Sequence, residues 1–254
     1  MAESSRDLRS HVPGDPGLCP YTVERVAMWH RWDQLTFLHW PFEPDLVQSL
    51  LPPGLTVETY EERAWVGLVP FIMEVRRTSS GRLLRWPFLF PETNVRTYVT
   101  GPDGIPGVWF LSLESSRLGA VPAARSTYRV RYFWSQMSVS RGEHSMLYSA
   151  RRRWPGKRGA QSETRVSIGS RYEPSDLGAF DHFLTARWVM YGSWGNKLLM
   201  AYAVHEPWEL FRATADCSDE LVAAAGLPQP IEQPIVHWSP GVDVAIGYPH
   251  RIQG

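Results

Sequence analysis

The stretch that decides the fold reads Phe90-Pro91-Glu92-Thr93-Asn94-Val95-Arg96-Thr97-Tyr98-Val99. Side chains of a strand alternate between its two faces, so Val95, Thr97 and Val99 share a face suited to a core. The opposite face carries four polar side chains, Glu92, Asn94, Arg96 and Tyr98. Such a face is either the ordinary exterior of a one-sided sheet or, if the sheet closes on itself, the polar wall of an interior cavity. The residues predict a strand and leave both placements open.

Most of the remaining chain also has the pattern of strands separated by turns. We expect further strands at residues 34–40, 56–60, 64–76, 107–113, 128–139, 145–154, 164–170, 198–205, 210–214, 236–238 and 242–246. Helices are expected at residues 43–51, 115–124, 175–190 and 218–226. These helices are too few and too irregularly spaced for repeated strand–helix–strand units. The sequence therefore predicts a mainly β (α+β) fold with a mixed or antiparallel sheet, curled into a barrel or a sandwich.

Composition excludes several classes of protein. Lys+Arg and Asp+Glu both number 26, so the formal charge is zero, whereas binding to nucleic acid or to an anionic membrane requires a basic surface. Residues 1–20 lack periodicity and an apolar signal-peptide segment, and no apolar run approaches a membrane span. We expect a disordered tail over residues 1–20, a single domain over residues 21–250, and a cytoplasmic protein with neither nucleic-acid nor membrane partners.

Two other segments combine apolar and polar side chains. In the strand expected at residues 128–139, one face carries Tyr128, Val130, Tyr132 and Trp134. This aromatic face either packs in the core or forms a ligand wall. The helix expected at residues 175–190 has an apolar stripe that includes Arg187. Its guanidinium either pairs with a carboxylate or reaches solvent, or it anchors the carboxylate of a ligand.

Familiar catalytic motifs are missing from the sequence. It has no GxSxG, Walker or GxGxxG segment, and its eight histidines show no HxH or HxxxH spacing. Cys19 and Cys217 form no CxxC motif and give little indication of a disulfide framework. We therefore expect no metal and no cofactor.

Six sequence blocks together resemble a known family. They are residues 36–42 (TFLHWPF), 51–55 (LPPGL), 64–71 (AWVGLVPF), 90–99 (FPETNVRTYV), 107–113 (GVWFLSL) and 239–244 (SPGVDV). Their order, over about residues 28–246, resembles the uncharacterised bacterial YqjF-like family, which is grouped with the acetoacetate decarboxylase-like superfamily. The resemblance implies a closed or nearly closed β-barrel with a central cavity and a few short flanking helices, and no established activity.

The resemblance also implies site residues. Better-known members of the superfamily use a lysine that forms a Schiff base with a keto acid, assisted by a glutamate and an arginine. Glu92 and Arg125 match the glutamate and the arginine, whereas Tyr132 stands at the position of the lysine. A phenol cannot form an imine, and Lys157 and Lys197 lie outside this strand. We therefore do not expect Schiff-base decarboxylation.

Two functions remain open. In the first, the protein binds a small organic acid or an apolar metabolite in its central cavity, through Asn94, Arg96, Tyr98, Arg125, Tyr128 and Arg187. In the second, it is an enzyme of the lyase, hydrolase or isomerase type, with Glu92 as general acid or base and Tyr132 as hydrogen-bond donor to an oxyanion. The expected partner is a small organic ligand in both cases. Whether the chain forms a homo-oligomer is left open.

Overall fold

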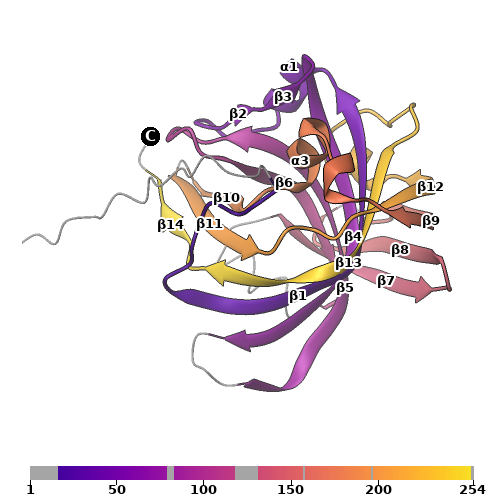
Figure 1. Ribbon diagram of the computed structural model, residues 1–254. Helices are drawn as coiled ribbons and strands as arrows, with labels where there is room; N and C mark the ends of the chain where they lie inside the picture. Colours follow the sequence, from indigo (N-terminus) through magenta and orange to yellow (C-terminus); the bar gives the residue numbers. More distant parts are fainter. Residues whose placement is uncertain (1–16, 79–82, 118–130, 157, 196, 253–254) are drawn as a thin grey trace, which may run out of the picture.

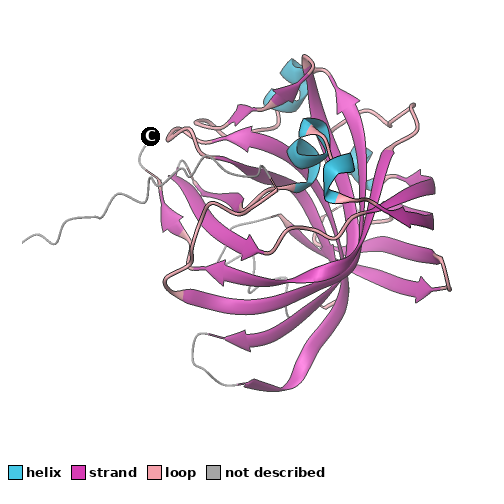
Figure 2. Cartoon of the chain, in the orientation of Figure 1, coloured by secondary structure: helices cyan, strands magenta, loops and turns pink. Residues whose placement is uncertain are grey.

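The computed structural model describes residues 17–78, 83–117, 131–156, 158–195 and 197–252, and strands dominate this part of the chain (Figure 2). The strands are β1 (Val26–Phe42), β2 (Thr56–Val57), β3 (Thr59–Tyr60), β4 (Arg63–Thr78), β5 (Leu83–Thr100), β6 (Pro106–Ser115), β7 (Tyr132–Arg141), β8 (Ser145–Trp154), β9 (Gln161–Arg171), β10 (Val189–Trp194), β11 (Lys197–His205), β12 (Phe211–Asp219), β13 (Ile235–Gly247) and β14 (His250–Arg251). The helices are α1 (Pro44–Gln48), the short 3-10 helix η1 (Pro174–Asp176), α3 (Ala179–Thr185) and α4 (Leu221–Ala224). The mainly β prediction is confirmed.

The strands form one sheet arranged as a ring (Figure 1). One closed circuit of pairings runs through β6, β7, β8, β9, β12, β13, β1, β4 and β5 and returns to β6. A second circuit runs through β10, β11, β13, β1, β4, β5 and β6 and returns to β10. The long strands β1, β4 and β5 belong to both circuits, so both of their faces can be buried.

Burial on β5 decides between the two placements of its polar face. Val95, Thr97 and Val99 are fully buried on one side, as a core face requires. Glu92 and Arg96 on the other side are only 3% and 7% exposed. The polar face of this strand is therefore an interior wall and not a solvated exterior.

The helix expected at residues 175–190 is much shorter in the structure. α3 covers only Ala179–Thr185, and the chain re-enters the sheet as β10. β10 pairs with β11 along its whole length and, in parallel, with β6. This pairing explains the error: the backbone of residues 189–194 bonds to other strands, and the sheet context overrides the helical periodicity of the side chains.

Some expectations fall on residues that the structure does not describe. The helix expected at residues 115–124 lies mostly outside the described residues, and β6 still includes Ser115. Residues 1–16 are also outside them, so a tail over residues 1–20 and a single domain over residues 21–250 stay predictions. None of the helices in the described part of the chain has the length and apolar character that crossing a bilayer requires.

Candidate functional site

A small internal cavity lies inside the circuit that contains β10 and β11. Its lining comes from β1, β4, β5, β6, β10, β11 and the segments next to them: Trp32, Leu35, Val69, Phe71, Glu92, Asn94, Arg96, Val108, Phe110, Arg187, Val189, Met190, Ala203 and Trp208. Its volume is about 50 Å³, enough for a few water molecules or one small organic group. The wall is mostly apolar, with the polar groups concentrated on β5.

Glu92 is the carboxyl group of this wall, and its partner is Tyr132. The Tyr132 hydroxyl donates a hydrogen bond to Glu92 Oε2. The sheet brings them together because β5 pairs with β6, and β6 pairs with β7, where Leu113 lies opposite Tyr132. Burial raises the pKa of Glu92 to about 8, against the smaller opposing effect of the hydrogen bond from Tyr132. At neutral pH this carboxyl group is therefore mostly protonated.

Arg96 is the cationic group of the same wall. Its Nη2 donates to the backbone oxygen of Leu184 at 3.2 Å and more weakly to the Tyr98 hydroxyl at 3.5 Å, and the guanidinium lies over the Phe37 ring. Its buried Nε has no hydrogen-bond partner, and no carboxylate pairs with it among the residues that the structure describes. An unpaired buried guanidinium beside a cavity is suited to an anionic ligand.

Glu92 and Arg96 share a face of β5 but do not pair with each other. Four residues along a strand separate their Cα atoms by about 13 Å. Glu92 instead bonds to β7, and Arg96 bonds to the end of α3. The largely neutral carboxyl group of Glu92 and the guanidinium of Arg96 thus lie in the same cavity wall without pairing with each other.

Tyr98 is fully buried and orders the surroundings of Arg96. Its hydroxyl donates to the Leu184 carbonyl oxygen at 2.5 Å and contacts His39 Nε2 at 2.6 Å. Since the single phenolic proton goes to the carbonyl, His39 must donate from Nε2. Burial, Arg96 and then His237 lower the pKa of His39, so this histidine is neutral at pH 7. Tyr98 therefore supports Arg96 from behind the cavity wall.

Arg187 lines the cavity but has a carboxylate partner. Its Nη1 lies 2.7 Å from Glu58 Oε2, and its Nε donates to the Phe183 oxygen at 3.0 Å. The guanidinium also lies 5.0 Å from the centre of the Tyr98 ring. Because Glu58 balances this charge, Arg96 supplies the excess positive charge of the cavity.

The other predicted residues are placed as follows. Asn94 lines the cavity, and its buried Oδ1 has no hydrogen-bond partner among the described residues. Arg125, Tyr128 and Lys157 lie outside the described part of the chain. Lys197 is exposed at the start of β11, opposite Trp194, and does not line the cavity. In the described residues no group of three or more His, Cys, Asp or Glu could hold a metal ion.

Sequence reasoning missed two kinds of site residue. Trp32 and Trp208 close the cavity from β1 and from the segment before β12, with their rings stacked 6.3 Å apart. His39 and Glu58 contact the polar wall from outside the cavity. The alternation of β1 could have placed Phe37 and His39 on one face, but no local pattern shows that this face meets Tyr98.

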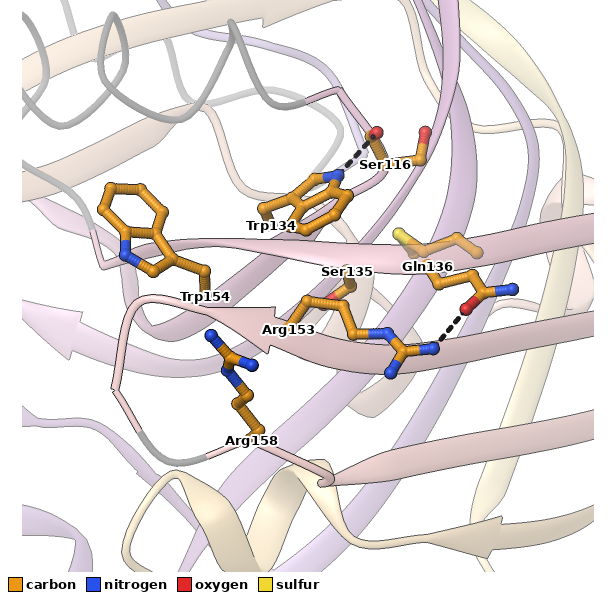
Figure 3. A pocket seen from close by; sticks show the side chains of 8 residues that line it. Ser116, Trp134, Ser135, Gln136, Arg153, Trp154 and Arg158 are labelled. Carbon is orange, nitrogen blue, oxygen red and sulfur yellow. Dashed lines mark hydrogen bonds between the residues drawn. The ribbon is translucent and has the colours of Figure 1, made fainter.

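A larger hollow lies elsewhere, at the surface (Figure 3). It has a volume of about 960 Å³ and includes two tryptophans, Trp134 and Trp154. Trp134 Nε1 donates to the Ser116 oxygen at 3.2 Å, and Arg153 Nη2 donates to Gln136 Oε1. None of the predicted site residues that the structure describes lines it. We therefore place the candidate site in the small cavity.

The fold can be compared with those of solved structures. Solved structures with the same fold include the enduracididine biosynthesis enzyme MppR in complex with pyruvate, which is 13% identical with a TM-score of 0.62, over 89% of this chain and 90% of that one. Acetoacetate decarboxylase from Legionella pneumophila is 13% identical with a TM-score of 0.58, over 100% of this chain and 98% of that one. At these identities the likeness concerns the fold, which is acetoacetate decarboxylase-like, as the sequence predicted.

The family follows from the sequence comparison. Residues 30–243 match the DUF2071 model, which is described as an uncharacterized conserved protein, and the chain belongs to this family. It is similar to the uncharacterized protein YqjF of Bacillus subtilis (strain 168), with 29% identity over 224 residues, 85% of this chain and 89% of that protein. The resemblance to a YqjF-like family is thus confirmed.

Proposed function

We propose that the protein binds a small organic acid in the internal cavity, with Arg96 as the group that holds its carboxylate. The unpaired, buried guanidinium of Arg96 carries this proposal. The net charge of the cavity supports it: Glu92 is mostly neutral at pH 7, and Arg187 is paired with Glu58. A bound carboxylate would compensate the remaining charge and could accept hydrogen bonds from a guanidinium edge.

The size of the cavity limits the ligand to a few non-hydrogen atoms. Pyruvate, which is bound in the MppR complex, is of that size and combines a carboxylate with an apolar methyl group. The apolar wall formed by Phe71, Val108 and Trp208 suits such a methyl group. Asn94 and the protonated Glu92 are hydrogen-bonding groups for the keto oxygen.

A thermal-shift titration with pyruvate, acetate, lactate and acetoacetate tests binding, with the neutral analogue acetone as a comparison. We expect at least one acid to stabilise the protein, by about 2.7 kcal/mol at a hundred times its Kd. Arg96→Gln should abolish the response, whereas Arg63→Gln, at a partly exposed arginine that pairs with Glu43 and does not line the cavity, should retain it. A response to none of the acids, or an undiminished response in Arg96→Gln, would show the proposal to be wrong.

The contact between Tyr132 and Glu92 favours a second candidate, acid/base catalysis. Glu92 lines the cavity, Tyr132 donates a hydrogen bond to it from outside the lining, and the pKa of Glu92 of about 8 suits proton transfer near neutral pH. The carboxylate form could remove a proton next to a carbonyl group, while Arg96 stabilises the resulting enolate. Because Tyr132 is itself buried beside a carboxyl group, its own pKa is raised, so it retains its proton.

Exchange of the pyruvate methyl protons in D2O, followed by proton NMR, tests catalysis separately from binding. We expect the protein to accelerate exchange over buffer, with a rate that rises as the pH passes through about 8 and Glu92 ionises. Glu92→Gln should lose the acceleration while still binding pyruvate, and Glu163→Gln, at an exposed carboxylate, should keep it. Binding without exchange in the unaltered protein would leave binding as the function and exclude this reaction of pyruvate.

A further inference from the structure

A second hollow, here called the outer hollow, shares a lining residue with the internal cavity. Its volume is about 340 Å³, and its lining comes from the segment after α1, from β6 and β10, and from the residue before β7: Ser49, Leu50, Leu51, Pro52, Trp109, Phe110, Arg131, Tyr191 and Ser193. Phe110 lines both this outer hollow and the internal cavity. This half-buried residue is thus shared by the linings of the two spaces.

The sheet has a break at this place. On one edge of β6, Val108 and Trp109 pair with β10, and pairing with β7 begins only at Leu113. In the described chain no ladder partner lies on this edge of residues 110–112. The distance from Trp109 to Leu113 along the strand is about 13 Å. β10 stops pairing with β6 after Tyr191, so among the described residues the pairing along this edge is interrupted at Phe110.

The outer hollow carries groups that suit an anion. Arg131 is exposed, and no carboxylate pairs with it in the part of the chain that the structure describes. Trp109 Nε1 is buried and has no hydrogen-bond partner among these residues. The hydroxyl-bearing residues Ser49 and Ser193 complete the polar part of the lining. A single cation at a narrow mouth raises the local concentration of small anions.

We infer that this outer hollow is the access route to the internal cavity for small carboxylates, with Phe110 as its gate and Arg131 as the group that attracts them. The inference rests on the proposed function for the identity of the molecule that enters. Rotation of the Phe110 ring opens the passage, because no described strand pairs with this edge of β6 at that residue. Arg131 and Arg96 then lie at the outer and inner ends of one route.

The test measures access and needs no ligand. A cysteine is placed inside the cavity by Val69→Cys, in a background with Cys19→Ser and Cys217→Ser. Its labelling is followed by mass spectrometry with neutral methyl methanethiosulfonate and with anionic sulfonatoethyl methanethiosulfonate. Phe110→Ala should accelerate both reactions at least tenfold, and Phe110→Trp should slow both.

Phe71→Ala is the matched control, since Phe71 lines the cavity but not the outer hollow. It should accelerate labelling far less than Phe110→Ala does. Equal acceleration by the two changes, or none by Phe110→Ala, would show that access lies elsewhere. If the labelling rates change as expected but the protein binds no pyruvate, the access route stands and only the proposed class of ligand is wrong.

Arg131→Gln tests the charge at the mouth. It should slow the anionic reagent about threefold at low ionic strength and leave the neutral reagent unchanged, and the difference should shrink in about 1 M salt because salt screens exposed charges. The Arg131→Lys variant should be labelled by both reagents at the same rates as the parent protein. An unchanged rate for the anionic reagent in Arg131→Gln would overturn the role of Arg131.

Discussion

Glu92 and Glu114 are buried glutamates on neighbouring strands, and they face opposite sides of the sheet. The register places Glu92 opposite Ser115 and Thr93 opposite Glu114. Since cross-strand partners share a face and successive residues alternate, the two carboxyl groups point away from each other. Glu92 lies on the face that lines the cavity and meets Tyr132 of β7, whereas Glu114 lies on the opposite face and meets Ser135 of β7 and Arg152 of β8.

Their partners differ in charge. Glu114 forms an ion pair with Arg152, whose Nε lies 3.1 and 3.3 Å from the two carboxylate oxygens, and accepts a hydrogen bond from Ser135 at 2.5 Å. Arg152 in turn stacks over the Phe133 ring at 3.8 Å. Glu92 has a phenol in place of a cation among the described residues. One face of the sheet therefore holds an ion pair between Glu114 and Arg152, here called the clamp. The other face holds Glu92, a carboxyl group able to exchange protons.

Removing the cation of the clamp should have the largest effect. Arg152→Met leaves Glu114 buried without a counter-charge, so we expect a loss of about 3–5 kcal/mol in the free energy of unfolding by urea. Arg96→Met should cost much less, because Arg96 balances no described carboxylate and Tyr98 still bonds the Leu184 oxygen. Equal losses in the two variants would mean that Arg96 is also part of an ion pair.

A double variant checks the cause of that loss. Glu114→Gln combined with Arg152→Met removes both charges, and it should recover most of the stability lost in the single variant. A double variant as unstable as Arg152→Met alone would attribute the loss to packing of the Arg152 side chain on Phe133 and not to the unpaired carboxylate.

Removing the carboxyl group of Glu92 should have a smaller effect that depends on pH. The pKa of Glu92 is about 8 in the folded chain, against 4.5 as its ordinary value. The folded state therefore binds the proton more tightly, and the stability present below about pH 4.5 is lost progressively as the pH rises to about 8. Glu92→Gln lacks this dependence, so it should match the parent at about pH 5 and exceed it by a few kcal/mol near pH 9.

Urea unfolding at several pH values measures this difference. Glu163→Gln serves as the control because its carboxylate is exposed, and it should follow the parent at every pH. Parallel pH profiles for the parent and Glu92→Gln would show that the Glu92 carboxyl group ionises in its ordinary range. Glu92 would then not differ in its ionisation from the other carboxyl groups of the protein.

The sequence predicted the polar face of β5 better than the segment around α3. Glu92, Asn94 and Arg96 share a face because a strand alternates with a period of two, which is a local property that the chain cannot change without losing the strand. Whether that face lies inside or outside depends on ring closure through β10 and β11, which no local pattern shows. For residues 189–194, pairing with distant strands outweighed the helical spacing of the side chains.

The site partners were harder to predict than the wall itself. Tyr132 meets Glu92 only because β7 pairs in parallel with β6, and the family resemblance, not the alternation of residues 128–134, suggested this meeting. The partners of the two arginines, Glu58 for Arg187 and the Leu184 oxygen for Arg96, come from segments distant in sequence. Such contacts depend on the completed ring and leave no local signal in the sequence.

The smallest effects come from removing one hydroxyl group beside each carboxyl. The hydrogen bond from Tyr132 favours the ionised form of Glu92. Because Tyr132→Phe deletes this bond, the pKa of Glu92 should rise above about 8. We expect a loss of about 1–2 kcal/mol at pH 9 and less at pH 6, because a hydrogen bond to the charged form is the stronger one. Ser135→Ala should cost less than about 1 kcal/mol at both pH values, since Arg152 still pairs with Glu114. Urea unfolding of both variants at about pH 6 and pH 9 measures the difference. A loss in Tyr132→Phe that is the same at both pH values would show that Glu92 does not change its protonation between them, and the assignment of a proton-exchanging carboxyl group to the cavity face would be wrong.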